Sequence, residues 1–232
     1  MLNILFSFIC AISHSAEDIS FVIKKMNENY VNSKNYRVNS HYKLFKGHDS
    51  GNLIEQYKGF TENSEYGFYQ KIGESEKIIT KDFYLHISHP ERALVYGFPI
   101  SFNFNQDVQG ALKLCTSAKL EVVGSDYILT FSYQNGANFE FSKIKLVISK
   151  DEYLLKAIDM YYSTLTDFST KFSQTDYEQP HLQIIFSNYK NSVEMDRSYF
   201  NLSNFLKIGE DHILKTVGTC SGYELIDIRT NQ

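Results

Sequence analysis

The sequence has no tryptophan, and only 3 of its 232 residues are proline and 3 are cysteine. With 12 glycines, it fits neither a collagen-like repeat nor a proline- or glycine-rich disordered chain. It also lacks a basic surplus, because 23 lysines and arginines stand against 27 aspartates and glutamates. A general nucleic-acid-binding protein needs a basic surface that displaces counterions from phosphates, so the composition argues against nucleic acid as a partner.

The familiar motifs of catalysis and metal binding are missing too. No HExxH, CxxC, GxSxG, GxGxxG or GxxxxGK[ST] pattern occurs. We therefore expect no enzyme, no catalytic residue, no metal ion and no cofactor. A hydrolase would require two or three side chains to converge in one cleft from a set of five candidates: His86, His89, Glu76, Asp82 and Cys115.

No apolar run is long enough to cross a bilayer, which takes about 20 residues. The apolar stretch near the N-terminus, followed by small residues around Ser13 and Ser15, predicts a signal peptide over residues 1–16. We expect an exported, periplasmic protein with no transmembrane span in the mature chain. Cleavage would remove Cys10 and leave Cys115 and Cys220, which either pair in the oxidising compartment or remain buried thiols.

Aromatic residues are abundant, with 17 tyrosines and 18 phenylalanines, and they follow two different periods. Residues 16–32 carry apolar side chains at helical spacing, from Ile19 to Tyr30, and predict an amphipathic helix. After Asn35 the period changes to two, in short segments separated by turn residues, which is typical of an antiparallel meander. A second short helix is expected over 105–116, and further antiparallel strands follow it. No linker interrupts residues 17–232, which predicts a single domain.

The apolar positions of these strands are the candidate binding residues. One side of a curved antiparallel sheet is either an ordinary core or, if incompletely filled, an apolar cleft for a hydrophobic ligand. The candidates for lining such a cleft are Tyr42, Leu44, Tyr66, Phe68, Phe83, Leu85, Leu129, Phe131, Ile158, Met160, Ile184 and Phe186.

The order of elements, with the stretches Tyr66–Ile72, Ile78–Ile87 and Arg92–Tyr96, resembles the periplasmic outer-membrane lipoprotein-carrier (LolA/LolB-like) superfamily, as an envelope branch of it. The resemblance implies an α+β, mainly β fold, with a curved antiparallel sheet, an open half-barrel, wrapping the N-terminal helix and the second short helix. It also implies a non-enzymatic protein whose apolar concave cleft accepts lipid or lipoprotein acyl chains. No arginine here matches the surroundings of the family's acyl-gating arginine. The alternative function is an envelope protein-interaction or structural module with a closed core.

Overall fold

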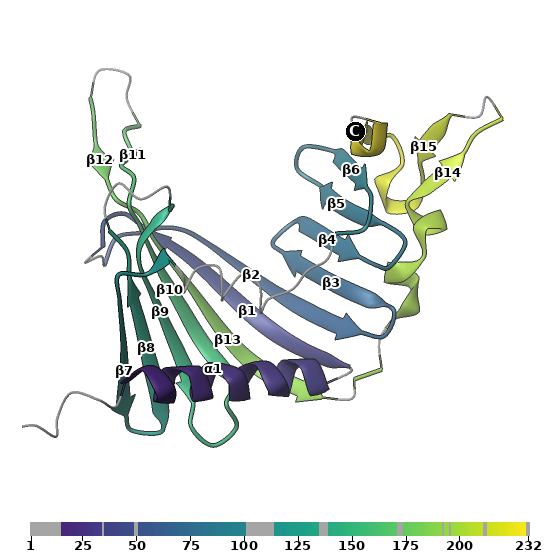
Figure 1. Ribbon diagram of the computed structural model, residues 1–232. Helices are drawn as coiled ribbons and strands as arrows, with labels where there is room; N and C mark the ends of the chain where they lie inside the picture. The colour runs from purple at the N-terminus through teal and green to yellow at the C-terminus, as the bar shows by residue number, and fades with distance from the viewer. Residues whose placement is uncertain are drawn as a thin grey trace, which may run out of the picture. The chain divides into compact units, whose positions relative to one another are not determined.

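The structure is a computed structural model, and it describes residues 15–33, 35–48, 51–100, 114–134, 139–170, 174–191, 193–194, 196–210 and 213–230 (Figure 1). The expected signal peptide over residues 1–16 and the expected second helix over 105–116 lie mainly outside these ranges. No helix within the described ranges is long and apolar enough to cross a membrane.

The N-terminal helix, α1 (Ser15–Asn32), forms where the helical period predicts it. Its stripe of Ile19, Val22, Ile23 and Met26 is buried, with Met26 fully excluded from solvent. The opposite side carries exposed charge, and Glu28 lies 3.2 Å from Lys25 Nζ and 3.8 Å from Lys24 Nζ. The apolar stripe therefore packs on the sheet, where α1 lies against β7.

Most of the described chain is β-strand. The strands are β1 (Tyr36–Phe45), β2 (Leu53–Ser64), β3 (Gly67–Ile72), β4 (Ser75–Ile79), β5 (Tyr84–Ser88), β6 (Ala93–Gly97), β7 (Ser117–Val123), β8 (Asp126–Ser132), β9 (Phe141–Ser149), β10 (Leu155–Tyr162), β11 (Thr166–Asp167), β12 (Tyr177–Glu178), β13 (His181–Asn191), β14 (Leu206–Ile208), β15 (Leu214–Thr216) and β16 (Glu224–Asp227). Short 3-10 turns η1 (Arg197–Phe200), η2 (Leu202–Asn204), η3 (Gly218–Cys220) and η4 (Ile228–Thr230) shape the C-terminal segment.

Twelve of the strands form one sheet in the order β16-β6-β5-β4-β3-β2-β1-β13-β10-β9-β8-β7. The order ends at β16 and β7, so the sheet is open. The expectation of a mainly β, α+β fold with an open antiparallel sheet is confirmed. The pairs β11–β12 and β14–β15 stand apart as two-stranded ribbons.

The chain divides into two compact units, and β1, β2 and β13 contribute residues to both. Unit 1 comprises Met1–Asn32, Lys43–Gln56 and Phe104–Ile185, and unit 2 comprises Ser33–Tyr42, Tyr57–Asn103 and Phe186–Gln232. Unit 1 therefore contains α1 with β7 to β10, and unit 2 contains the meander from β3 to β6 with the C-terminal segment.

One strand departs from the antiparallel rule. β16 pairs with β6 in parallel, with Leu225 opposite Leu94, and the Glu224 N–H donates to the Arg92 carbonyl at 2.8 Å. A parallel partner requires a long connection, and residues 98–223 separate β6 from β16; the last part of this connection, from η1 to η3, crosses back to β6. That crossover packs Phe205 and Cys220 into the core of unit 2.

Candidate functional site

Two adjacent rows of apolar side chains cross unit 1 on one face of the sheet. The strand register places residues opposite one another along β7, β8, β9, β10 and β13, and directly opposite residues share a face. The inner row is Leu120, Leu129, Leu146, Ile158 and Ile184. The outer row is Ala118, Phe131, Ile144, Met160 and Leu182.

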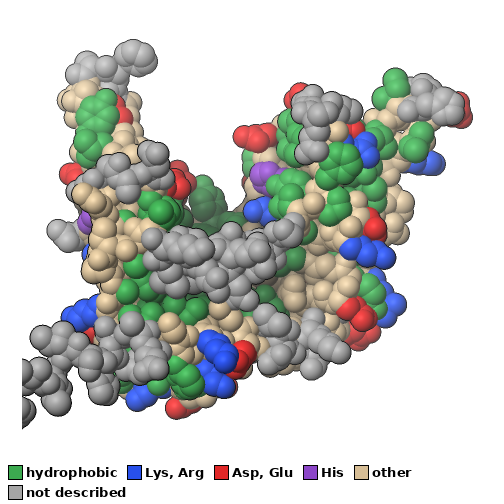
Figure 2. Space-filling view, viewed as in Figure 1, with side chains coloured by type: hydrophobic (Ala, Val, Ile, Leu, Met, Phe, Trp, Pro, Cys, Tyr) green, Lys and Arg blue, Asp and Glu red, His purple; other side chains and the backbone are tan. Residues whose placement is uncertain are grey.

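Helix α1 covers these rows unevenly. Its C-terminal half is tied to the β9–β10 end of the strands, where the Leu155 N–H donates to Tyr30 Oη at 3.3 Å. Ile148 at that end and Leu129 in the inner row are fully buried. Both rows mix buried and half-buried residues: Phe131 in the outer row is buried, whereas Leu120 and Ile158 in the inner row and Ile144 and Met160 in the outer row are half-buried. Apolar surface thus remains partly accessible in both rows, and Figure 2 shows hydrophobic side chains at the surface of this unit.

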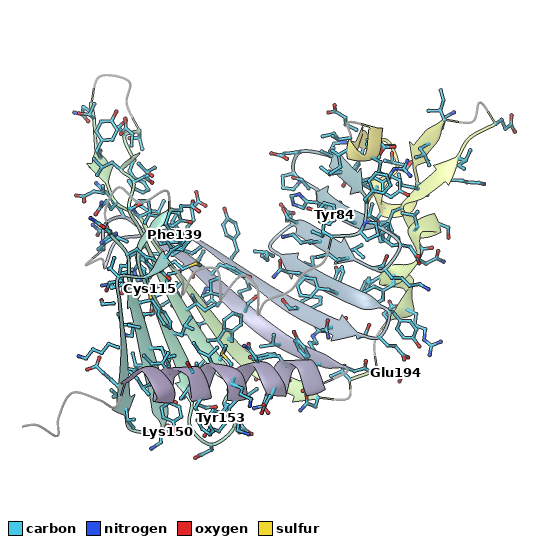
Figure 3. The ribbon with its side chains drawn as sticks, viewed as in Figure 1. Tyr84, Cys115, Phe139, Lys150, Tyr153 and Glu194 are labelled. Carbon is cyan, nitrogen blue, oxygen red and sulfur yellow. The ribbon has the colours of Figure 1, made fainter. Side chains whose placement is uncertain are left out.

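Aromatic rings close the far end of the rows. The Tyr133 ring lies 4.3 Å from the Phe139 ring, and Phe139 lies 5.7 Å from Phe141, measured between ring centroids. Figure 3 shows Phe139 and Cys115 at the end of unit 1 opposite to Tyr153. Burial, followed by the proximity of Cys115, raises the pKa of Tyr133 to about 12, so this hydroxyl stays neutral and the wall uncharged at neutral pH.

The structure brings together five of the twelve sequence candidates. Leu129, Phe131, Ile158, Met160 and Ile184 all lie in the two rows of unit 1. Three other candidates lie on two further strands. Tyr42 and Leu44 are two positions apart on β1, and Phe186 is on β13.

The four candidates of the meander in unit 2 do not share one face. Phe68 pairs with Ile79, whereas Leu85 pairs with Ile78, so Phe68 and Leu85 lie on opposite sides of the sheet. Leu85 and Phe83 are buried in the core beneath the C-terminal segment. Tyr66 lies in the β2–β3 turn, and the Arg197 guanidinium lies 4.7 Å from its ring centroid.

The five candidates for a hydrolase do not assemble as a set. His89 Nε2 lies 3.0 Å from Glu76 Oε1, so these two converge. Glu76 lies opposite Ile87, and His86 is the residue before Ile87 on β5. The His86 side chain therefore lies on the other face of the sheet from Glu76. Asp82 is in the turn before β5, and Cys115 belongs to unit 1. Cys115 and Cys220 do not form a disulfide with each other.

The contact between His89 and Glu76 extends into a hydrogen-bonded chain that fastens the C-terminal segment to the sheet. Tyr223 Oη lies 2.9 Å from His89 Nδ1, and Tyr69 O–H donates to Glu76 Oε2 at 3.0 Å. Within the ranges that the structure describes, no group of three or more His, Cys, Asp or Glu side chains could hold a metal ion.

A second buried polar cluster lies in unit 1. His181 Nε2 lies 3.0 Å from Asp159 Oδ1, and Gln183 Nε2 donates to the same oxygen at 2.9 Å. Burial works to raise the pKa of Asp159, but these hydrogen bonds and the electrostatic interactions with His181 and Lys145 outweigh it, so the pKa lies below its ordinary value. The His181 ring stacks on Tyr161 with centroids 4.2 Å apart, which fixes its orientation.

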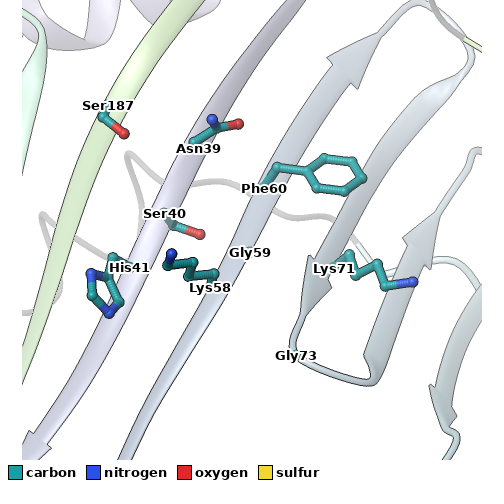
Figure 4. Close-up of a pocket in the computed structure, with 9 residues that line it drawn as sticks. All are labelled: Asn39, Ser40, His41, Lys58, Gly59, Phe60, Lys71, Gly73 and Ser187. Carbon is teal, nitrogen blue, oxygen red and sulfur yellow. The ribbon is translucent and has the colours of Figure 1, made fainter.

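Unit 2 contains a pocket of about 450 Å³ that the sequence did not indicate (Figure 4). Its lining residues come from β1, β2, β3, β13 and the β3–β4 turn, and they are Asn39, Ser40, His41, Lys58, Gly59, Phe60, Lys71, Gly73 and Ser187. Polar residues at alternate strand positions are usually solvated, so they gave no signal. The available signal was Gly59 inside a strand, which marks a close backbone approach.

No family model matches the sequence, and no curated protein matches it. Several solved structures are similar to this chain. An uncharacterised conserved protein from Thermus thermophilus is 7% identical, with 90% of this chain and 99% of that one covered and a TM-score of 0.47. A LolA superfamily protein from Nitrosomonas europaea is 9% identical, covers 82% and 98%, and has a TM-score of 0.36.

A third structure, a putative outer membrane lipoprotein-sorting protein domain from Vibrio parahaemolyticus, is 8% identical, with coverages of 79% and 96% and a TM-score of 0.36. The resemblance found in the sequence thus recurs among the structures to which the chain is similar. At TM-scores below 0.5 this likeness carries no argument about function. The function proposed below rests on the chain's own residues.

Proposed function

We propose that the protein binds the acyl chain of a lipid or lipoprotein on the two apolar rows of unit 1, as a non-enzymatic, carrier-like protein of the cell envelope. The carrying observation is the outer row, in which Phe131, Ile144, Met160 and Leu182 align across four strands and Ile144 and Met160 stay half-buried. A fully closed core would leave less of such a row accessible than this. Export to the periplasm and the signal peptide are part of the same proposal.

The chemistry of the rows suits an acyl chain. Each buried methylene contributes about 0.8 kcal/mol, so a tail that covers several residues of the outer row gains useful affinity without any polar contact. Aromatic rings at the far end add a wall that contacts a chain edge-on or face-on. Nothing covalent is required, and release of the ligand would follow from a competing apolar surface on a partner.

The test is uptake of a fluorescent fatty acid by the purified chain and by Met160→Asp. Met160 lies in the centre of the outer row, between Ile144 and Leu182, so a carboxylate there places charge against the tail. We expect the dissociation constant to rise at least about tenfold, which corresponds to about 1.4 kcal/mol.

The matched control is Val123→Asp, which introduces the same charge in the same unit. Val123 is 57% exposed and pairs with Asp126, at the parity opposite to the rows. The affinity of Val123→Asp for the fatty acid should equal that of the unchanged chain. If the two variants bind equally, or the unchanged chain takes up no fatty acid, the acyl-binding proposal is wrong and the closed interaction module becomes the better account.

A further inference from the structure

The pocket of unit 2 is positively charged. None of the nine residues that line it is acidic, in a chain that has more acidic than basic residues overall. Six lining side chains carry hydrogen-bond donors: Asn39, Ser40, His41, Lys58, Lys71 and Ser187.

The two lysines of the pocket differ in what they contact. Lys71 Nζ lies 3.5 Å from Glu76 Oε1, so its charge is partly neutralised. Among the described residues, no carboxylate forms an ion pair with Lys58. In Figure 4 the Lys58 side chain extends toward Ser40 and His41 on β1, whereas Lys71 extends away from β1. The uncompensated charge of the pocket is therefore that of Lys58.

The backbone beneath Lys58 is held closely. The Gly73 N–H donates to the Lys58 carbonyl at 2.9 Å, which joins the β3–β4 turn to β2. A Cβ atom at Gly59 would lie 2.2 Å from the Lys71 carbonyl oxygen, so β2 and β3 approach closely at this point. The base of the pocket is a fixed frame, and the donors around it need little ordering when a ligand binds.

We propose that this pocket binds a phosphoryl group carried by a small molecule or by a lipid headgroup. An ammonium group is a compact charge that suits the tetrahedral oxygens of phosphate, and Lys58 acts together with the Asn39 amide and the Ser187 hydroxyl. The volume of about 450 Å³ lies in the range of small-molecule sites and leaves room for an organic part. The Phe60 ring supplies an apolar wall for it.

The first experiment is calorimetric titration of the full chain with glycerol 3-phosphate. We expect saturable binding that weakens at least about tenfold in Lys58→Gln, because one charge-assisted hydrogen bond is lost. The control is Lys77→Gln, which removes the same charge from the same unit. Lys77 pairs with Gln70 and His86, so its side chain lies on the face of the sheet opposite to Lys71. The affinity of Lys77→Gln for glycerol 3-phosphate should therefore match that of the unchanged chain.

The second arm identifies the source of the phosphoryl group. Binding of glycerol 3-phosphate in solution indicates a free ligand, whereas Lys58-dependent binding to phosphatidylglycerol vesicles alone indicates a headgroup. Glycerate, a carboxylate of similar size, should bind more weakly than glycerol 3-phosphate. No binding in either arm, equal loss in Lys58→Gln and Lys77→Gln, or equally tight glycerate binding would each overturn the proposal. Met160→Asp should leave phosphoryl binding unchanged, so the two proposals fail separately.

Discussion

Replacing Gly59 by alanine should destabilise the protein strongly, although it adds a single methyl group. The new Cβ would lie 2.2 Å from the Lys71 carbonyl oxygen, 3.1 Å from Ile72 Cα and 3.2 Å from the Lys71 carbonyl carbon. All three atoms belong to the backbone of β3, so no side chain can turn away to make room. The strands would have to separate by about 1 Å, which breaks a hydrogen bond of ordinary length.

The cost can be estimated from its parts. Forcing an extra methyl group into a packed position costs about 1–3 kcal/mol. One or two backbone hydrogen bonds beside the Gly59–Ile72 pair add about 1 kcal/mol each. Removing a glycine from the unfolded chain returns about 0.4–1 kcal/mol. The expected net loss is about 2–3 kcal/mol, which lowers the melting temperature of a chain of this size by roughly 5–10 °C.

The assay is thermal and urea denaturation followed by circular dichroism, with Gly51→Ala as the control. A Cβ atom added at Gly51 would meet no atom within 4 Å, and its φ is one that other residues adopt, so this replacement should be neutral or slightly stabilising. Because Gly59 also lines the pocket, Gly59→Ala should in addition weaken phosphoryl binding. Equal melting temperatures for Gly59→Ala and Gly51→Ala would refute the reasoning.

Two further predictions concern unit 1. The pKa of Asp159 is lower in the folded chain than its unfolded value of about 3.9, so its contribution to stability is present above that pH and is lost on acidification. Urea midpoints should therefore fall between pH 7 and pH 3 less steeply in Asp159→Asn than in the unchanged chain, and equal slopes would contradict this. Met26→Ala should lower the free energy of unfolding by about 2–5 kcal/mol, because the Met26 side chain is fully buried on the apolar side of α1. Lys24→Ala, on the exposed side of the same helix, should change it by less than about 1 kcal/mol; unfolding in urea measures both.

The elements that the sequence predicted correctly are those in which apolar residues repeat with a single period, either helical or alternating. The stripe from Ile19 to Met26 predicted α1, and alternation predicted the shared row of Phe131 and Met160. The apolar parity of β9 slips between Phe141 and Ile144, and the β9–β10 register shifts at the same place, between Tyr161 and Tyr162. In these places one face is apolar and the other polar, so period alone assigns each residue to a face.

The same reasoning fails in the meander of unit 2 for a physical reason. One face of β3 to β6 packs against the C-terminal segment, through Phe205 and Cys220, and the other carries Phe68. Both faces are therefore partly apolar, and alternation cannot distinguish Phe68 from Leu85. The parallel pairing of β16 was missed for a related reason, because a short strand after a long crossover has no hairpin turn to set its direction.

The strand order also governs how the protein can fold. Strands β2 to β6 join neighbours along the chain through short turns, so they can pair as soon as they are synthesised. β1, by contrast, takes β13 as its second neighbour, and β6 takes β16 from the very end of the chain. Closing these two distant junctions costs the most chain entropy, so we expect them to form last. Until β16 pairs with it, β6 remains an unprotected edge on which other chains can add.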